Sequence, residues 1–227
     1  MTGRGLKISF FEFFIALAAN NRKSWFDEHR AEYENNVKKP FENLVAELLQ
    51  VFAELEGVGI GIKPGDCIFR INRDIRFAKD KTPYKLNRSA IISAEGKKSI
   101  GPEGFYFEAG PEECAFYAGY YMPDKTQLAA IRQAIANEPE RWLAITQNPG
   151  FVKTFGVVLG KQQKRLPPEF RQQADQLPIL YNTQFYVEHK MEPEIFIDED
   201  PVKQLISLWN TAKPWVNFLY DATSAKV

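Results

Sequence analysis

The chain has 227 residues, enough to bury a sizeable core, and this length favours one large domain over two small ones. Its composition, 44% hydrophobic and 26% charged, is typical of a soluble globular protein. Lys plus Arg and Asp plus Glu number 29 each, so the formal net charge is zero. A neutral chain has no global field to hold it on nucleic acid or an anionic membrane. We therefore expect no general nucleic-acid partner and no membrane partner.

Cysteine usage and hydropathy favour a cytoplasmic protein. Cys67 and Cys114 are too few for a disulfide framework or a metal-binding spacing, and their apolar neighbours predict buried free thiols. The apolar run 10–19 contains Glu12 and is about half the ~20 residues of a membrane span. No charged-then-apolar leader precedes it. We expect a single cytoplasmic domain over residues 1–227.

The N-terminal third is predicted to be helical. Ser9 and Glu12 have the spacing of a capping box, which opens a helix through about Ala19. A second helix follows and ends before Pro40, a residue that suits the first position of a third helix. Apolar residues recur in that third helix at three-four spacing until Gly57 ends it. The apolar side of the second helix carries Trp25, Phe26, His29, Tyr33 and Val37.

Strands are predicted after these helices. Residues 57–65 are expected to form a loop or an edge strand, and residues 68–72 and 89–94 are expected to form short strands of the same sheet as the hairpin described next. Residues 104–109 and 114–122 are aromatic-rich runs with four residues between them, which is the spacing of a β-hairpin. Strands joined so closely must be antiparallel.

The C-terminal part is predicted to return to helices. Asp124 caps one helix and Pro139 begins another, whereas residues 160–180 are polar, contain prolines and are expected to be irregular. Residues 184–191 alternate enough to form a returning strand.

Asp200 and Pro201 begin a final helix that is bent or broken at Pro214 and ends near Tyr220. Helices, then strands, then helices indicate an α+β fold. We expect an antiparallel sheet covered by N-terminal and C-terminal helices.

The segment 68–88, IFRINRDIRFAKDKTPYKLNR, concentrates positive charge. It holds seven basic and two acidic residues, a local excess of 7 − 2 = +5 in a neutral chain. As a strand it would place Arg73 in the middle of an apolar face. Alternatively the strand ends near Asn72 and the arginines converge from a loop. In both geometries a carboxylate or a ligand anion must pair with Arg73, because burying an unpaired charge costs free energy.

This segment predicts a site for a phosphorylated or carboxylated small molecule, because a guanidinium fork binds either group bidentately. Asp74 is expected to orient an arginine without touching the anion. Pro83 restricts Thr82 to an extended conformation and so fixes the residues around it. The alternative is that acids satisfy the cluster, which then is an internal ion network or grips an acidic partner. The predicted ligands are Arg70, Arg73, Arg76, Lys81 and Tyr84.

The familiar catalytic motifs are missing from the sequence. It contains no dinucleotide fingerprint, phosphate loop, nucleophile elbow or HExxH motif. His29 and His189 are the candidates for a general base near neutral pH. His189 with Glu192, three residues on, could join a metal site, but two potential ligands are too few to predict one. We therefore expect no metal and no cofactor, and no reaction can be assigned. A less favoured function is stacking of single-stranded nucleic acid on Tyr106, Tyr117, Tyr120 and Tyr121.

Two stretches resemble a bacterial family of about this length that is catalogued as a domain of unknown function. The residues that carry the resemblance are Asn20–Phe26, His29, Arg30 and Tyr33, then Arg70, Arg73, Asp74, Arg76 and Phe77, followed by Asp80, Lys81 and Tyr84. The resemblance covers most of the chain. It implies no catalytic residues, because the family has no assigned activity.

Overall fold

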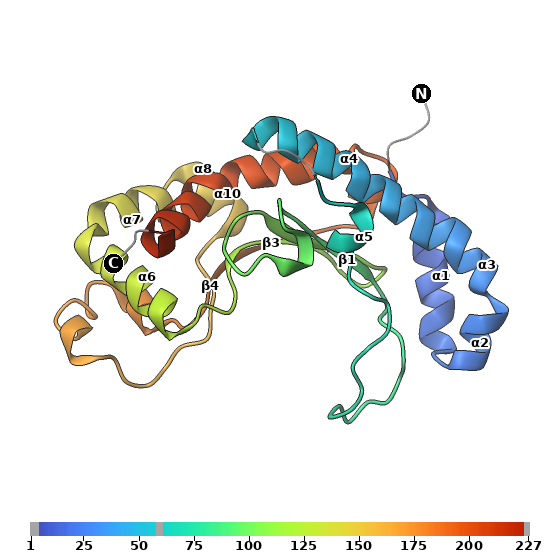
Figure 1. Ribbon diagram of the computed structural model, residues 1–227, viewed down its shortest axis with the longest axis horizontal. Helices are drawn as coiled ribbons and strands as arrows, with labels where there is room; N and C mark the ends of the chain where they lie inside the picture. Colours follow the sequence, from blue (N-terminus) through green and yellow to red (C-terminus); the bar gives the residue numbers. More distant parts are fainter. Residues whose placement is uncertain (1–4, 58–60, 225–227) are drawn as a thin grey trace. The chain divides into compact units, whose positions relative to one another are not determined.

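The computed structural model describes residues 5–57 and 61–224, and it has an α+β fold (Figure 1). N-terminal helices and a long C-terminal helix pack against a four-stranded antiparallel sheet, which confirms the expected fold class. The strands lie in chain order: β1 (Arg88–Ile92), β2 (Phe105–Ala109), β3 (Cys114–Tyr120) and β4 (Phe185–Met191).

The chain divides into two compact units. Unit 1 comprises Met1–Lys98, Tyr106–Phe116 and Lys190–Ile206, and unit 2 comprises Ser99–Phe105, Tyr117–His189 and Ser207–Val227. Strands β2, β3 and β4 each contribute residues to both units. The single domain expected over 1–227 stays a prediction.

The predicted hairpin and the returning strand are confirmed. β2 and β3 are neighbours joined by residues 110–113, and β4 follows the irregular segment as expected. Alternate residues of β2 are buried because one face of the strand packs on the core, where the Phe107 ring lies 5.4 Å from Phe41 and 6.3 Å from Phe196.

The helices of unit 1 are α1 (Ile8–Ala19), α2 (Lys23–Glu28), α3 (Arg30–Glu32), the π-turn η1 (Tyr33–Lys38), α4 (Lys39–Glu56), α5 (Pro64–Cys67) and α9 (Glu194–Ile197), with a 3₁₀ turn η2 (Gly96–Lys98). Phenylalanines fill their interior: Phe10, Phe14 and Phe41 are fully buried. Gly57 ends α4 as predicted, with φ +65°, a backbone conformation that glycine adopts without steric cost.

The start of α1 and the approach to Pro40 differ from expectation. The predicted capping box is wrong, because α1 already begins at Ile8 and Ser9 is therefore inside the helix. The helix predicted to end before Pro40 also does not end there. Lys39 donates to the Glu34 carbonyl five residues back, and this wider turn relieves the clash that a proline ring makes in a regular helix.

The segments between α4 and β1 contain less strand than predicted. Of the expected loop or edge strand 57–65, residues 58–60 lie outside the described part of the chain, and Pro64 begins the short helix α5 instead. Residues 68–72 form no regular strand, so that expectation is wrong. They make two isolated antiparallel bridges, Ile68 with Ala90 and Asn72 with Tyr84. Phe69 still donates to the Ser89 carbonyl of β1 (2.9 Å), and beyond it the segment pairs with itself and leaves the sheet.

Unit 2 contains the helices α6 (Lys125–Asn137), α7 (Pro139–Thr146) and α8 (Pro149–Phe155), with 3₁₀ turns η3 (Pro168–Phe170) and η4 (Pro178–Tyr181) in the segment predicted to be irregular. Asp124 caps α6 as expected, in a reciprocal box with Gln127. The buried side chain of Arg132 donates to the carbonyls of Leu180 (2.8 Å) and Asn182 (3.0 Å), so it fastens the irregular segment to α6.

The last helix, α10 (Pro201–Ser224), is longer than expected. It is not broken at Pro214 and it ends at Ser224 instead of near Tyr220. The proline is exposed, whereas its neighbour Trp215 is fully buried against Trp142, with ring centroids 5.2 Å apart. The packing of the Trp215 face of α10 compensates for the backbone hydrogen bond that is lost at Pro214.

Two other expectations concern the thiols and the membrane. Cys67 and Cys114 are buried and free, as predicted. Within residues 5–57 and 61–224, no helix combines the length and hydrophobicity that crossing a bilayer requires.

Candidate functional site

Residues 69–85 of unit 1 form a two-stranded loop, here called the arm, that projects from the sheet between α5 and β1 (Figure 1). Backbone hydrogen bonds hold its two sides together: Lys85 donates to Ile71 (2.8 Å) and Arg73 donates to Pro83 (2.8 Å). The arm contains all the residues that the sequence predicted as an anion site. Its geometry divides their side chains into two groups.

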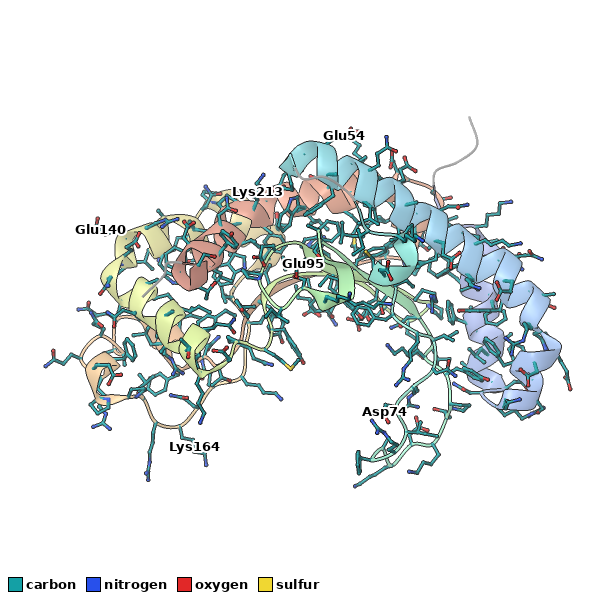
Figure 2. All side chains as sticks on the ribbon, in the orientation of Figure 1. Glu54, Asp74, Glu95, Glu140, Lys164 and Lys213 are labelled. Atoms are coloured by element: carbon teal, nitrogen blue, oxygen red, sulfur yellow. The ribbon has the colours of Figure 1, made fainter. Side chains whose placement is uncertain are left out.

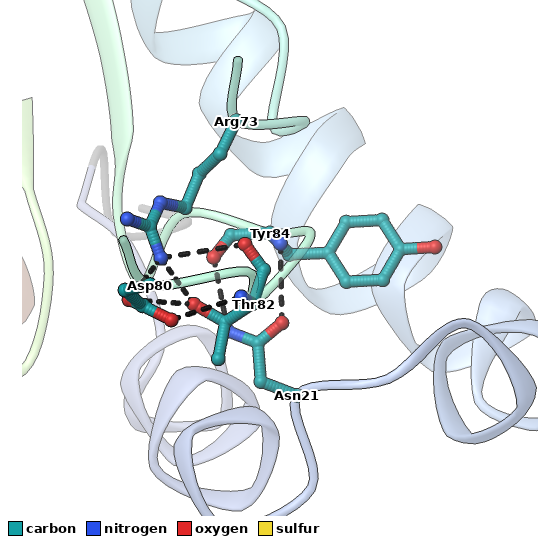
Figure 3. Close-up of polar contacts among 5 residues, drawn as sticks. All are labelled: Asn21, Arg73, Asp80, Thr82 and Tyr84. Carbon is teal, nitrogen blue, oxygen red and sulfur yellow. Dashed lines mark hydrogen bonds and ion pairs between the residues drawn. The ribbon is translucent and has the colours of Figure 1, made fainter. Parts of the chain in front are cut away.

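Arg73 is satisfied inside the arm (Figure 3). One of its terminal nitrogens donates to the Asp80 carboxylate and to the Thr82 hydroxyl, with a longer bond to the Thr82 carbonyl (3.3 Å). Hydrogen bonds from the Thr82 backbone and from Arg73 lower the pKa of Asp80 to about 2. The carboxylate that Arg73 was expected to need is therefore Asp80.

Arg76 and Lys81 also bind within the arm. Asp74 accepts two bonds from the Arg76 guanidinium, from Nε (2.9 Å) and Nη2 (2.7 Å), and this pair lowers the pKa of Asp74. The Lys81 ammonium donates to the Ile75 carbonyl (2.9 Å). These contacts fix the shape of the turn at the end of the arm.

Tyr84 anchors the arm to the N-terminal helices. Its ring is buried and stacks on Phe26 with centroids 4.2 Å apart. The Asn21 side chain bonds the Tyr84 backbone twice, accepting from its N–H (3.1 Å) and donating to its carbonyl (2.9 Å) (Figure 3). Two stretches that the sequence showed separately, 20–26 and 70–84, therefore meet at this point.

Arg70 and Lys85 have no ion pair within the described residues. Arg70 is exposed, and Lys85 is half-buried with its ammonium 5.7 Å from the centre of the Phe69 ring. Burial lowers the pKa of Lys85, Glu108 opposes the shift, and the charges of Arg88 and Arg70 add to it. Lys85 thus lies within electrostatic reach of both arginines.

Arg88, the first residue of β1, was not among the predicted ligands. It is 6% exposed, and its Nε has no hydrogen-bond partner among the described residues. Its guanidinium lies 5.7 Å from the centre of the Phe41 ring, and no carboxylate in the described chain forms an ion pair with it. Burial lowers the pKa of Arg88, and Tyr33 and Glu42 oppose that shift. We call Arg70, Lys85 and Arg88 the inner basic cluster.

A sequence signal for Arg88 did exist. Residues 88, 90 and 92 share one face of the strand, and Ala90 and Ile92 are apolar, so Arg88 was placed to point into the core. The charge count of the segment included Arg88 but gave it no separate role.

The other candidate residues are engaged locally. His29 pairs through Nδ1 with the Trp25 carbonyl (2.9 Å) and stacks on the Trp25 ring, and His189 pairs with the Thr154 carbonyl (2.8 Å). Within the described residues, no three His, Cys, Asp or Glu side chains are grouped to hold a metal ion.

Two of the four tyrosines considered for nucleic-acid stacking donate to acids, whereas Tyr121 is exposed with its ring 5.6 Å from that of Tyr186. In unit 1, Tyr106 donates to Glu108 (2.9 Å), and in unit 2, Tyr117 donates to Glu188 (2.8 Å). Tyr120 is buried. Carboxylates beside the rings repel a phosphate backbone.

The fold and the arm define an α+β protein with a preformed basic loop. A family model described as "Conserved hypothetical protein (DUF2461)" matches residues 9–218. The chain therefore belongs to this family of conserved hypothetical proteins, in agreement with the resemblance seen in the sequence. No curated protein and no solved structure matched the chain.

Proposed function

We propose that the chain binds the phosphate or carboxylate group of a small molecule at the inner basic cluster. The observation that carries this proposal is the buried guanidinium of Arg88, whose Nε has no hydrogen-bond partner in the described chain. Taking an unpaired charge out of water is costly, and proteins normally offset that cost with a partner charge or hydrogen bonds. The ring of Phe41 and the nearby Glu42 and Tyr33 offset part of it, and a bound anion would offset more.

The three cations of the cluster would have different roles. Arg88, which lies by Phe41 on the core face, offers a planar fork for two anion oxygens. Lys85 lies by Phe69 and Glu108 on the other face of the sheet, so it would act on the anion through its electric field and not as a direct ligand. Arg70 is exposed and would meet the ligand first. Glu108, which acts on Lys85 electrostatically, would hold the lysine in place.

This proposal keeps Arg70 from the predicted site and gives the other members a different role. Arg73, Arg76 and Lys81 hold the arm together with Asp74, and Tyr84 anchors it. The version in which Arg70, Arg73, Arg76, Lys81 and Tyr84 themselves bind the anion stays a prediction, and it can be tested separately. A cytoplasmic location belongs to the same proposal and is supported by the two free thiols.

Thermal unfolding in the presence of simple anions tests the proposal. Phosphate, pyrophosphate and citrate at millimolar concentration should raise the melting temperature above that in chloride of equal ionic strength, because a ligand that binds the folded state stabilises it by mass action. Arg88→Met should abolish this increase.

Arg132→Met is the matched control, because Arg132 is also a buried arginine, 4% exposed, but it already donates to two carbonyls. It should keep the full response to anions. The proposal is wrong if no anion shifts the melting of the parent protein, or if Arg88→Met responds as the parent does.

A further inference from the structure

The end of the arm carries an exposed aromatic ring. Phe77 is 96% exposed, the highest value for a large hydrophobic side chain in the described part of the protein. Figure 2 places the labelled Asp74, three positions before it, on the part of the arm that extends away from the sheet. A single exposed apolar residue is common on protein surfaces, so the argument depends on what surrounds Phe77.

The turn that carries Phe77 is held in a defined shape. On one side Asp74 binds Arg76 through two hydrogen bonds, and on the other Asp80 binds Arg73 and the Thr82 backbone. Both acids of the segment 74–81 are used in this way. The charged side chains of the turn other than Lys79 thus bond within the arm, while its largest apolar side chain faces water.

Basic residues share the turn with Phe77. The Arg76 guanidinium lies 6.0 Å from the centre of the Phe77 ring, and Lys79 and Lys81 are exposed. Residues 74–81 hold three basic and two acidic side chains, a net charge of 3 − 2 = +1. A protruding aromatic ring with one guanidinium beside it and two exposed lysines on the same turn fits a surface that has anionic groups above an apolar layer.

We propose that the end of the arm binds an anionic phospholipid bilayer, with Phe77 inserted at the level of the headgroups and with Arg76 and Lys79 near lipid phosphates. A bilayer fits the ring better than a protein pocket does, because a side chain exposed on nearly all sides suits a fluid that closes around it. The earlier expectation of no membrane partner rested on the net charge of the whole chain. Attraction to a membrane surface falls off within a Debye length of ~8 Å, so the charges at the end of the arm decide it.

Vesicle sedimentation tests the proposal in the intact protein. Binding should be weak and salt-sensitive with vesicles of phosphatidylcholine and phosphatidylglycerol at 70:30 (about the anionic fraction of a charged leaflet), and absent with phosphatidylcholine alone. Phe77→Ala should weaken it about tenfold or more, since a buried Phe side chain contributes that much or more. The control Ile100→Ala removes another exposed apolar residue, 79% exposed, and should change nothing.

Two charge-reversal variants provide the second part of the test. Lys79→Glu should weaken binding at least fivefold, at about 1 kcal/mol for each basic residue near the surface. Lys98→Glu makes the same change at an exposed lysine outside the arm and should have little effect. Arg88→Met should leave vesicle binding intact, so this test does not depend on the small-anion site.

Fluorescence locates the ring directly. The four native tryptophans, Trp25, Trp142, Trp209 and Trp215, are all buried. In Phe77→Trp, bromine-labelled acyl chains should therefore quench the added fluorescence strongly and the native signal little. Equal binding to neutral vesicles, no binding at all, or full binding by Phe77→Ala would each overturn the proposal.

Discussion

Arg73 and Asp80, seven positions apart, form an ion pair across the arm, and the Thr82 hydroxyl binds both of them. Together with the Asp74–Arg76 pair, this contact takes two of the three predicted anion-binding arginines into the structure of the arm. Among the described residues of the segment, the basic side chains without an ion pair or hydrogen bond are Arg70, the exposed Lys79 at the end of the arm, and two residues that the motif did not single out, Lys85 and Arg88. Because these local ion pairs engage Arg73 and Arg76, we propose the anion site closer to the sheet than the end of the arm.

The first prediction concerns acid stability. The pKa of Asp80 is lowered from its ordinary value of 3.8 to about 2. A carboxyl group whose pKa is lower in the folded state stabilises that state at pH values above its unfolded-state pKa. This stabilisation is lost as the pH falls from about 4 toward 2. Asp80→Asn should therefore unfold more easily than the parent at pH 6 and equally easily near pH 2, as measured by urea unfolding. Asp175→Asn, at an exposed acid, is the control, and a deficit of Asp80→Asn that does not depend on pH would contradict the assignment.

The second prediction compares the two buried arginines without ligand. Replacing a buried charge that lacks a partner by an apolar group is often neutral or stabilising, so Arg88→Met should be as stable as the parent or more stable. Arg132→Met leaves the Leu180 and Asn182 carbonyls without their donor and should lose about 1–3 kcal/mol. Urea unfolding of the two variants measures both effects. A large loss of stability in Arg88→Met would indicate that its contact with Phe41 is structural.

The third prediction separates the two versions of the anion site. If the inner basic cluster binds the anion, Arg70→Ala and Lys85→Ala should each reduce the melting-temperature increase given by pyrophosphate. Arg73→Lys should lower the basal melting temperature, because lysine cannot reproduce the contacts to Asp80 and Thr82, but it should keep the increase. Loss of the increase in Arg73→Lys, with retention in Arg70→Ala, would favour the five-residue site at the arm.

The fourth prediction concerns the anchor of the arm. Asn21→Ala removes both hydrogen bonds to the Tyr84 backbone and should cost about 1–3 kcal/mol. Hydrogen exchange should then be faster at the amides of Arg73 and Lys85, whose bonds join the two sides of the arm. Asn35→Ala, which removes an exposed hydrogen bond to Lys39, should change neither amide. Unchanged exchange in Asn21→Ala would show that Phe26 alone holds Tyr84.

Local sequence patterns predicted those elements whose signals are themselves local. The hairpin of β2 and β3, the cap at Asp124 and the stop at Gly57 each depend on a few adjacent residues, and each was found. Two of the errors occurred where a neighbouring turn or packing compensates for a local rule. A π-turn accommodates Pro40, and the burial of Trp215 keeps α10 continuous through Pro214.

The sequence by itself determined that positive charge is concentrated between residues 68 and 88 and that the fold is α+β. It could not determine which cations remain without partners, because Arg73, Arg76 and Lys81 find theirs only when the arm closes on itself. Nor could the sequence show that the Arg88 charge is buried at a cost in free energy, since burial of a charge depends on the strand and helix that surround it. Composition counts charges, whereas the tertiary structure decides which charges are paired, and unpaired buried charge is what favours binding an anion.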